Sequence, residues 1–318
     1  MTVDAAAPGK GAGSAKTSPH PNQSLGLAFA LVSAAAYGTN IVSAQIAGQA
    51  GLSGPLLVFY RVALMLALVA LAALILRRRL DVPPQERGAM VAFGLFSAFV
   101  GCAYLSSVSF IPVTVAAVVF FTFPTLIVLA EPFMMRTPFR PGRLGLALLA
   151  FIGVICVVGP EFERLDPRGL VLALLASLFA AMQFFAGANL NRTGLVPKLF
   201  WSHVLILPVT LVILMLTGGV QPPAALLASP IAVAITMGGF LLGFVMQVMA
   251  LARAAPGPAA LAFCAEPVIA VAVAALVLGE RVGTLQYLGG ALVIVGIIAN
   301  VILEQKRASV EVQPHPER

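Results

Sequence analysis

Long apolar runs divide the chain between residues 25 and 303. A membrane-spanning helix needs about 20 mostly apolar residues, because a rise of about 1.5 Å per residue must cover about 30 Å of hydrocarbon. The pattern predicts ten spans, at 25–47, 55–76, 88–108, 112–134, 143–159, 168–190, 197–217, 229–250, 257–278 and 284–303. The runs do not alternate with period two, as barrel strands would. We therefore expect an all-α membrane protein.

The second half of this pattern repeats the first. The segment PLLVFYR at 55–61 returns as PKLFWSH at 197–203, and Gly94 returns as Gly238. Five spans separate equivalent positions, and because five is odd, the second copy must cross the membrane in the opposite direction. The predicted units are a disordered tail at 1–24, five-helix repeats at 25–159 and 168–303, and a tail at 304–318. Inverted repeats are typical of secondary transporters, which bind substrate near the midplane between the halves.

Composition supports a membrane location. The chain is 60% hydrophobic and only 10% charged, with a mean hydropathy of +1.01, whereas soluble domains contain about 25% charged residues. The first 24 residues lack the pattern of a cleavable signal peptide, so we expect the first span to remain as an anchor. Cys102, Cys156 and Cys264 all lie inside spans, which favours packing over a disulfide or a metal site. We expect no metal and no cofactor.

The cations fall mainly on one side of the predicted topology. Most of the 19 lysines and arginines lie in the two tails, in the loops at 76–88 and 134–143, and near Arg192 and Arg253. The other side holds Arg164, Arg168 and Arg281. The positive-inside rule predicts that both termini are cytoplasmic, in a bacterial-type inner membrane. Because topology accounts for the net charge of +7, the expected partners are the lipid bilayer and a small-molecule substrate, not nucleic acid, and the chain is expected to act as a monomer.

Two motifs of the second repeat have counterparts in a known family. Glu266-Pro267 precedes an apolar run that ends in Gly279-Glu280-Arg281, and a glycine-rich last span follows from Tyr287 to Gly296. These features resemble the drug/metabolite transporter superfamily, EamA type. The first repeat departs from the pattern, with Met135-Arg136-Thr137 where a Gly-Glu-Arg turn would be expected. The resemblance implies transport of amino acids, sugars, nucleotide-sugars or other metabolites, and the overall pattern is also similar to that of bacterial aromatic amino acid exporters.

Charged side chains inside the spans are candidates for the substrate site, because a charge in hydrocarbon needs a partner or a watery cavity. Glu266 lies nine residues into its span, about 13 Å deep by helical rise. It could bind an amine, carry a proton or be hydrogen-bonded as a structural group. His203 could bind substrate, titrate or simply bond a neighbouring helix. Arg61, its counterpart in the repeat, could hold a carboxylate, act in gating or extend to the outer interface. Glu131 is expected to form a surface ion pair with Arg136.

Neutral polar and aromatic residues complete the predicted site. Tyr37 and Asn40 are three residues apart and share a face of the first span. The predicted substrate-binding residues are Tyr37, Asn40, Gln183, Trp201, His203, Phe244, Gln247 and Glu266. Interhelical hydrogen bonds would explain any one of them equally well. Gly239 and Gly243 predict close helix packing, and Pro124, Pro208 and Pro267 are candidate kinks.

These features favour a secondary transporter that exports small metabolites, foremost aromatic or other neutral amino acids, by alternating access through a central cavity. A proton-coupled drug/metabolite antiporter and a sugar or nucleotide-sugar transporter are the alternatives within this class. An intramembrane enzyme would have to use Glu266 and His203, which no nucleophile or metal motif accompanies. We therefore expect no catalytic residues. The sequence has no G-x-x-x-x-G-K-[ST] loop, so direct use of ATP is not expected.

Overall fold

The structure is a computed structural model that describes residues 22–159 and 165–311, with side chains up to Lys306. The predicted disorder of 1–24 concerns residues that lie almost wholly outside this part. Residues 312–318 of the predicted C-terminal tail and the cations Lys10, Lys16, Arg164 and Arg318 also lie outside it, whereas residues 304–311, predicted as tail, continue the last helix.

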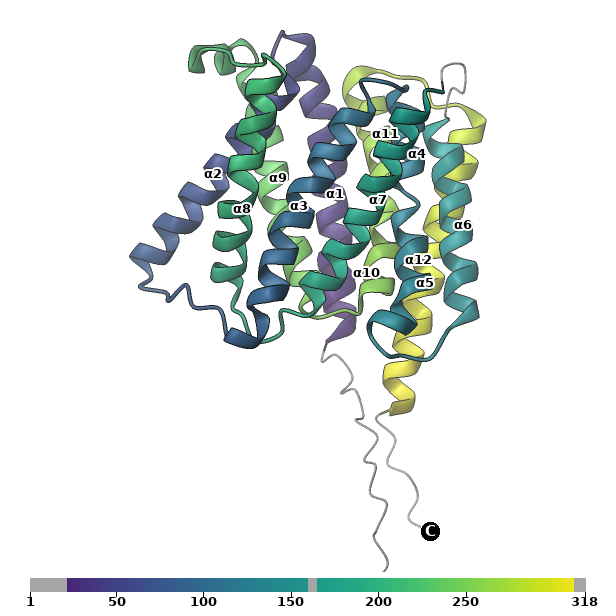
Figure 1. Cartoon of the computed structure of the whole chain (residues 1–318). Coiled ribbons are helices and arrows are strands. Elements are labelled where there is room, and N and C mark those ends of the chain that lie inside the picture. The colour runs from purple at the N-terminus through teal and green to yellow at the C-terminus, as the bar shows by residue number, and fades with distance from the viewer. Residues whose placement is uncertain (1–21, 160–164, 312–318) are drawn as a thin grey trace, which may run out of the picture.

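The described residues form helices and no strands, which confirms the all-α prediction (Figure 1). The elements are α1 (Gln23–Gln49), α2 (Gly54–Ile75), η1 (Pro84–Glu86), α3 (Arg87–Ser107), α4 (Val113–Phe120), α5 (Phe123–Met134), α6 (Pro141–Val158), α7 (Pro167–Ala188), α8 (Leu195–Leu216), η2 (Pro223–Ala228), α9 (Pro230–Leu251), α10 (Pro256–Phe263), α11 (Ala265–Leu278) and α12 (Thr284–Glu311). Within the described ranges, ten segments are long and apolar enough to cross a membrane. Their positions match the ten predicted spans.

Two of these segments are broken helices, which the sequence pattern did not resolve. The predicted span 112–134 consists of α4 and α5, and the span 257–278 consists of α10 and α11. Pro124 and Pro267 explain the breaks, because a proline has no N–H to donate to the carbonyl four residues earlier. Those carbonyls belong to Phe120 and Phe263, the last residues of α4 and α10. Helix α8, in contrast, continues through Pro208.

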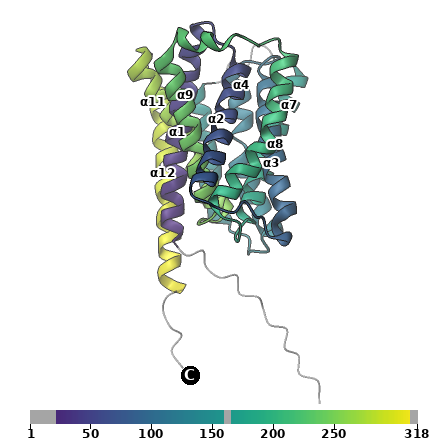
Figure 2. The ribbon, with the colours of Figure 1, turned by 90° about the vertical axis from the view of Figure 1, so that its left-hand side faces the viewer.

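The main helix contacts join one repeat to the other. Helix α1 packs on α9, α3 on α7, α2 on α8 and α6 on α12. The pair formed by α1 and α9 and the pair formed by α7 and α3 occupy equivalent places in the two inverted repeats. Figures 1 and 2 show the resulting bundle, in which helices from the two halves are intermixed. Helices of both repeats therefore meet inside the bundle.

Glycines let these pairs approach closely. A Cβ atom added to Gly239 would lie 2.9 Å from the Ala36 carbonyl oxygen, and one added to Gly243 would lie 2.7 Å from the Tyr37 ring. Contacts this short leave no space for a side chain, so the predicted packing role of the two glycines is confirmed. Gly153 and Gly289 bring α6 and α12 together in the same way.

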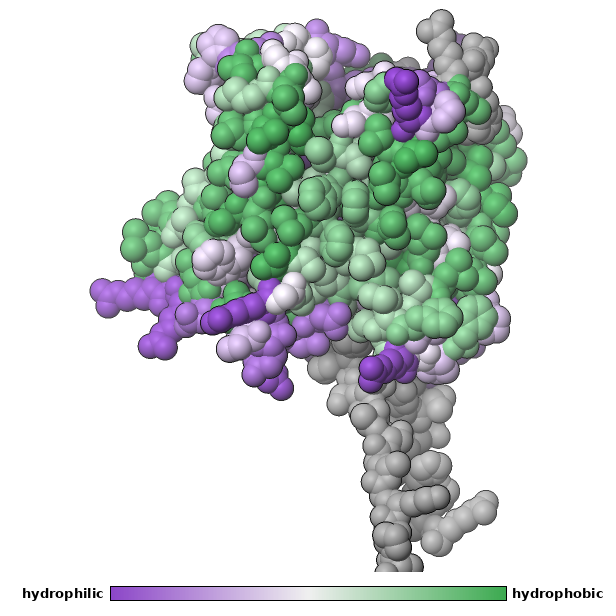
Figure 3. Space-filling view, in the orientation of Figure 1, coloured by the Kyte–Doolittle hydropathy of each residue, from purple (hydrophilic) through white to green (hydrophobic). Residues whose placement is uncertain are grey.

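On the face shown in Figure 3, a hydrophobic band covers the middle of the bundle, and hydrophilic side chains gather at its ends. The loops between α2 and α3 and between α5 and α6 lie at the lower end in Figure 1, where α1 begins and α12 ends. We call this end the cation-rich face, defined by Arg77, Arg78, Arg79, Arg87 and Arg136. Both described ends of the chain are thus on one side of the band, as an even number of crossings requires.

Candidate functional site

A hydrogen-bond chain connects four helices at the centre of the bundle. The Tyr37 hydroxyl on α1 donates to Gln247 Oε1 on α9 over 3.0 Å, and Gln247 Nε2 donates to Gln183 Oε1 on α7 over 3.4 Å. Gln183 Nε2 donates to Ser97 Oγ on α3 over 2.7 Å. Three of the predicted site residues are therefore in contact. Ser97 was missed, because a lone serine in an apolar span has no signal that distinguishes it.

Arg61 points into the bundle and does not extend to the outer interface. Its guanidinium lies 4.5 Å above the ring of Phe240, and one terminal nitrogen donates to Asn40 Oδ1 over 3.2 Å. Asn40 itself donates to the Thr236 carbonyl of α9. The buried Nε of Arg61 has no hydrogen-bond partner within the described part of the chain. Arg61 thus keeps an unused donor beside the central residues.

Glu266 lies in the first turn of α11, directly after the break at Cys264. Its side chain is partly exposed within a span, and the described residues offer it no hydrogen bond or ion pair. It is close enough to Tyr37 and Tyr104 for its charge to act on both hydroxyls. Tyr37 also feels the charge of Arg61. Glu266 and Arg61 also adjoin the same turn of α1, since a Cβ atom added to Gly38 would lie 2.7 Å from the Glu266 carbonyl oxygen and Arg61 bonds Asn40.

Aromatic rings form one wall beside these polar groups. The ring of Phe244 is 6.0 Å from that of Phe93 and 5.9 Å from that of Phe240, between ring centroids. His203 packs against this wall, with its ring 4.6 Å from that of Phe244. It is 0% exposed, and its Nδ1 lies 2.8 Å from the Leu199 carbonyl oxygen. The structure thus places Phe244 and His203 in contact with each other, with His203 fully buried.

Trp201 lies apart from the other predicted site residues. Its side chain is 39% exposed, and its indole N–H donates to the Leu80 carbonyl over 2.8 Å. Leu80 belongs to the loop between α2 and η1 at the cation-rich face. In this structure Trp201 therefore anchors a loop at the end of the bundle and does not contact the central cluster.

The expected surface pair between Glu131 and Arg136 is wrong. Glu131 is buried, and its Oε2 lies 2.5 Å from Arg143. Arg143, which is also buried, makes a second ion pair of 2.5 Å with Glu304 of α12. Arg136 is exposed and follows the end of α5. Sequence proximity suggested the wrong partner, because the folded chain brings α6 and α12 against the end of α5.

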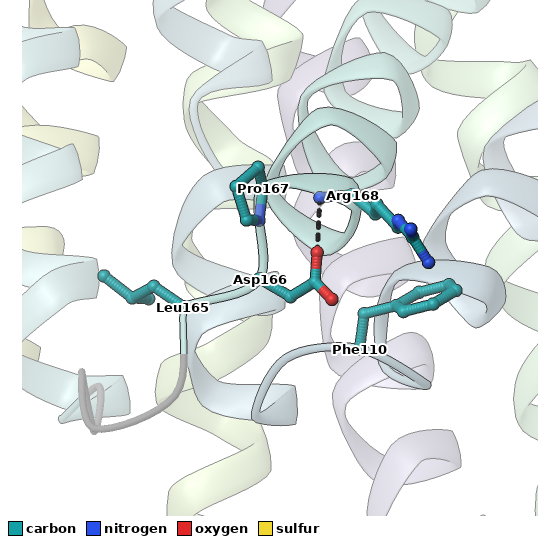
Figure 4. Close-up of a pocket in the computed structure, with 5 residues that line it drawn as sticks. All are labelled: Phe110, Leu165, Asp166, Pro167 and Arg168. Atoms are coloured by element: carbon teal, nitrogen blue, oxygen red, sulfur yellow. Dashed lines mark hydrogen bonds between the residues drawn. The ribbon is translucent and has the colours of Figure 1, made fainter.

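Two hollows lie away from the central cluster. One of about 640 Å³ is open to solvent at the start of α7, where Asp166 accepts a bond of 2.8 Å from the Arg168 N–H and Phe110 covers one side (Figure 4). The other, of about 330 Å³, is an apolar groove between α5 and α7 that includes Phe133 and Met182. Neither contains a predicted site residue. Among the described residues, no group of three His, Cys, Asp or Glu could hold a metal ion.

Comparison with known proteins agrees with this architecture. A solved crystal structure of a protein superposes with a TM-score of 0.72 at 18% sequence identity, over 89% of this chain and 98% of the other. At this identity the match supports the fold alone. No curated protein matches the chain, and the similarity to aromatic amino acid exporters stays a prediction. The sequence profile of the EamA-like transporter family matches residues 24–159 and again residues 167–302. The chain therefore belongs to the EamA-like transporter family, within the drug/metabolite transporter superfamily.

Proposed function

We propose that this protein is a secondary transporter that exports small zwitterionic metabolites, foremost aromatic and other neutral amino acids. The observation that carries the proposal is that Glu266 and Arg61, which have opposite charges, adjoin the same turn of α1: a Cβ atom added to Gly38 would lie 2.7 Å from the Glu266 carbonyl oxygen, and Arg61 bonds Asn40. Glu266 and Arg61 both act electrostatically on the Tyr37 hydroxyl. A site with one charge of each sign matches the ammonium and the carboxylate of an amino acid.

The surroundings of the two charges support binding of both ends of the substrate. Charges within a bilayer are costly and tend to mark a substrate or ion pathway. Glu266 has no partner among the described residues, and Arg61 keeps a buried nitrogen without one. The substrate ammonium would bind at Glu266 and its carboxylate at Arg61. The rings of Phe240 and Phe244 would contact the apolar or aromatic side chain of the substrate.

Alternating access is proposed from the two broken helices. Helix α10 starts at the cation-rich face, and all eight of its residues are buried. Its counterpart α4 starts at the opposite face, and of its residues only Val115 and Ala116 are buried. This difference supports a conformation that is closed at the cation-rich face and more open at the other. Exchange of the two environments would open the site to the opposite side.

Coupling to protons is a second candidate within the same mechanism. A carboxylate within a span can carry a proton when no cation neutralises it, and Glu266 fits that description among the described residues. Transport of nucleotide-sugars is less well supported, because their diphosphate would require several central cations. Arg61 is the cation that the structure places in the cluster.

Transport by purified protein in liposomes tests the proposal. We expect labelled phenylalanine or another neutral amino acid to be taken up, and uptake to respond to a pH gradient if protons are coupled. Glu266→Gln should lower the rate constant for amino acid uptake by about tenfold or more, because a bond to a charged group is worth about 1.5 to 3 kcal/mol.

Glu280→Gln is the matched control, since Glu280 is an exposed carboxylate just beyond the end of α11. It should transport like the original protein. If no amino acid in the panel moves, the proposed substrate class is wrong. If Glu266→Gln transports at the original rate, Glu266 does not bind the ammonium.

A further inference from the structure

The hydrogen-bond chain at the centre of the bundle ends on a backbone carbonyl. Ser97 Oγ donates to the carbonyl oxygen of Phe93 over 2.6 Å, one turn earlier on α3. From Ser97 the chain continues through Gln183 and Gln247 to Tyr37. It therefore connects α3 with α1 by way of α7 and α9.

This end point determines the direction of every bond in the chain. A carbonyl oxygen can only accept, so the single Ser97 hydroxyl proton is committed to Phe93. Ser97 Oγ can then only accept from Gln183, which must turn its NH₂ group toward it. The Gln183 oxygen consequently faces Gln247 and accepts from its NH₂ group.

These bond directions also determine which role the Tyr37 hydroxyl takes. Because the Gln247 NH₂ group faces Gln183, the Gln247 oxygen faces Tyr37 and accepts the phenol proton. A phenol has one proton, so the Tyr37 oxygen can offer only lone pairs to any other group. The carboxylate of Glu266, when ionised, also only accepts. Both groups at this end of the site are therefore acceptors.

We propose that Ser97, acting through Gln183 and Gln247, is a specificity-determining residue that makes the Tyr37 oxygen an acceptor toward the substrate and so selects a donor-rich ammonium group. The inference rests on the proposed function and names the chemical group that this end of the site requires. A substrate that carries an acceptor in place of the ammonium would face two acceptors and no donor. Sites built around hydrogen bonds reject such analogues strongly, since buried polar groups are then left without partners.

Ser97 does not touch the substrate in this account, so it is a positioning residue. Removing its hydroxyl leaves the Gln183 NH₂ group without its acceptor and lets both glutamine amides turn around. Tyr37 could then donate outward as well as accept. Selectivity for the amino group should fall, while affinity for the rest of the substrate should change little.

The test measures competition against uptake of labelled phenylalanine by protein in liposomes. The competitors are phenylalanine, phenethylamine, which lacks the carboxylate, and 3-phenylpropionate, which lacks the amino group. The ratio of half-inhibitory concentrations of 3-phenylpropionate and phenylalanine reports selectivity for the amino group. In Ser97→Ala we expect this ratio to fall about fivefold or more, the scale of one hydrogen bond.

Ser97→Thr keeps a hydroxyl that can bond the same carbonyl, and it should keep the original ratio. Ser107→Ala is the matched control. The Ser107 hydroxyl also donates to a carbonyl of α3, that of Tyr104, but Ser107 is not part of the hydrogen-bond chain. Gln183→Leu interrupts the hydrogen-bond chain at its middle and provides a second test if Ser97→Ala does not fold. It should lower the ratio in the same way.

Different results would overturn the role of Ser97 and the proposed function. If the original protein prefers phenylalanine over 3-phenylpropionate and both Ser97→Ala and Gln183→Leu keep that preference, the role of Ser97 is overturned and the proposed function stands. If phenylalanine uptake by the original protein is absent or indifferent to the amino group of the competitor, both proposals are overturned. The selectivity ratio could also fall as much in Ser107→Ala as in Ser97→Ala. That result would contradict the role of the hydrogen-bond chain.

Discussion

Arg61 and His203 occupy equivalent positions in the two repeats, and both lie beside the ring of Phe240. Their other contacts differ. Arg61 lies over that ring and bonds Asn40. The imidazole of His203 lies 5.9 Å from the same ring and is fully buried. Of these two equivalent residues, Arg61 is therefore the one that the proposed site uses.

Replacing Arg61 should affect the carboxylate end of the substrate. Arg61→Gln removes the charge that would bind a carboxylate, and we expect the KM for phenylalanine to rise about tenfold, the scale of one charge-assisted hydrogen bond. Inhibition by phenethylamine, which has no carboxylate, should change far less. The KM and the inhibition constant are measured in the same liposome assay.

Arg253→Gln is the control, because Arg253 also lies over a ring, that of Phe29, at 5.2 Å. It should leave both constants unchanged. An equal loss for phenylalanine and phenethylamine in Arg61→Gln would mean that Arg61 supports the fold and does not recognise a carboxylate.

At the scale of helices, prolines and glycines explain most of the geometry. Pro124 and Pro267 end the hydrogen bonding of α4 and α10, and the second break places Glu266 at the start of α11. These prolines were visible in the sequence as candidate kinks. Pro208 was also a candidate kink, but α8 continues through it. A proline alone therefore does not predict a break, since neighbouring helices can satisfy the carbonyl that it leaves.

Glycines of α6 give a direct test of close helix packing. A Cβ atom at Gly153 would lie 2.7 Å from the Gly289 carbonyl oxygen of α12, whereas one at Gly145, on the same helix, meets nothing within 4 Å. Gly153→Ala should destabilise the protein by about 1 to 3 kcal/mol, the usual cost of overpacking. Thermal unfolding of the purified protein in detergent measures the effect as a lower Tm.

Gly145→Ala should leave the Tm unchanged or raise it slightly, because alanine favours a helix over glycine. Equal Tm values for the two variants would show that α6 and α12 can separate without cost. The packing of this pair would then be looser than the structure indicates.

At the scale of the whole molecule, buried ion pairs connect α5, α6 and α12 at the cation-rich face. Arg143 of α6 contacts Glu131 of α5 and Glu304 of α12, and Glu304 accepts a further bond of 2.6 Å from Gln23 of α1. Removing the shared cation would leave two carboxylates buried together. Arg143→Gln should therefore destabilise the protein by about 3 to 5 kcal/mol, as a lower Tm in detergent.

Arg136→Gln is the informative control for this prediction. Arg136 is exposed, and exposed charges contribute about 0 to 1 kcal/mol. A larger loss for Arg136→Gln than for Arg143→Gln would favour a surface pair with Glu131 and contradict the buried arrangement.

Sequence alone was enough to predict ten spans, their inversion and the crowding of cations on one side. Those properties depend on local apolar length, on a repeated pattern and on charge counts, all of which can be read along the chain. It also predicted that Tyr37, Asn40 and Glu266 lie near the midplane, because depth follows from helical rise, and that Gln247 lies toward the inner end of its span.

Which side chains meet was decided by packing between segments far apart in the sequence. Tyr37 reaches Gln247, 210 residues away, because two glycines of α9 let α1 approach closely. Ser97 meets Gln183 for the same reason, because α3 and α7 belong to different repeats. Both contacts depend on how one repeat docks against the other, and apolar spans that look alike in sequence do not encode that docking locally.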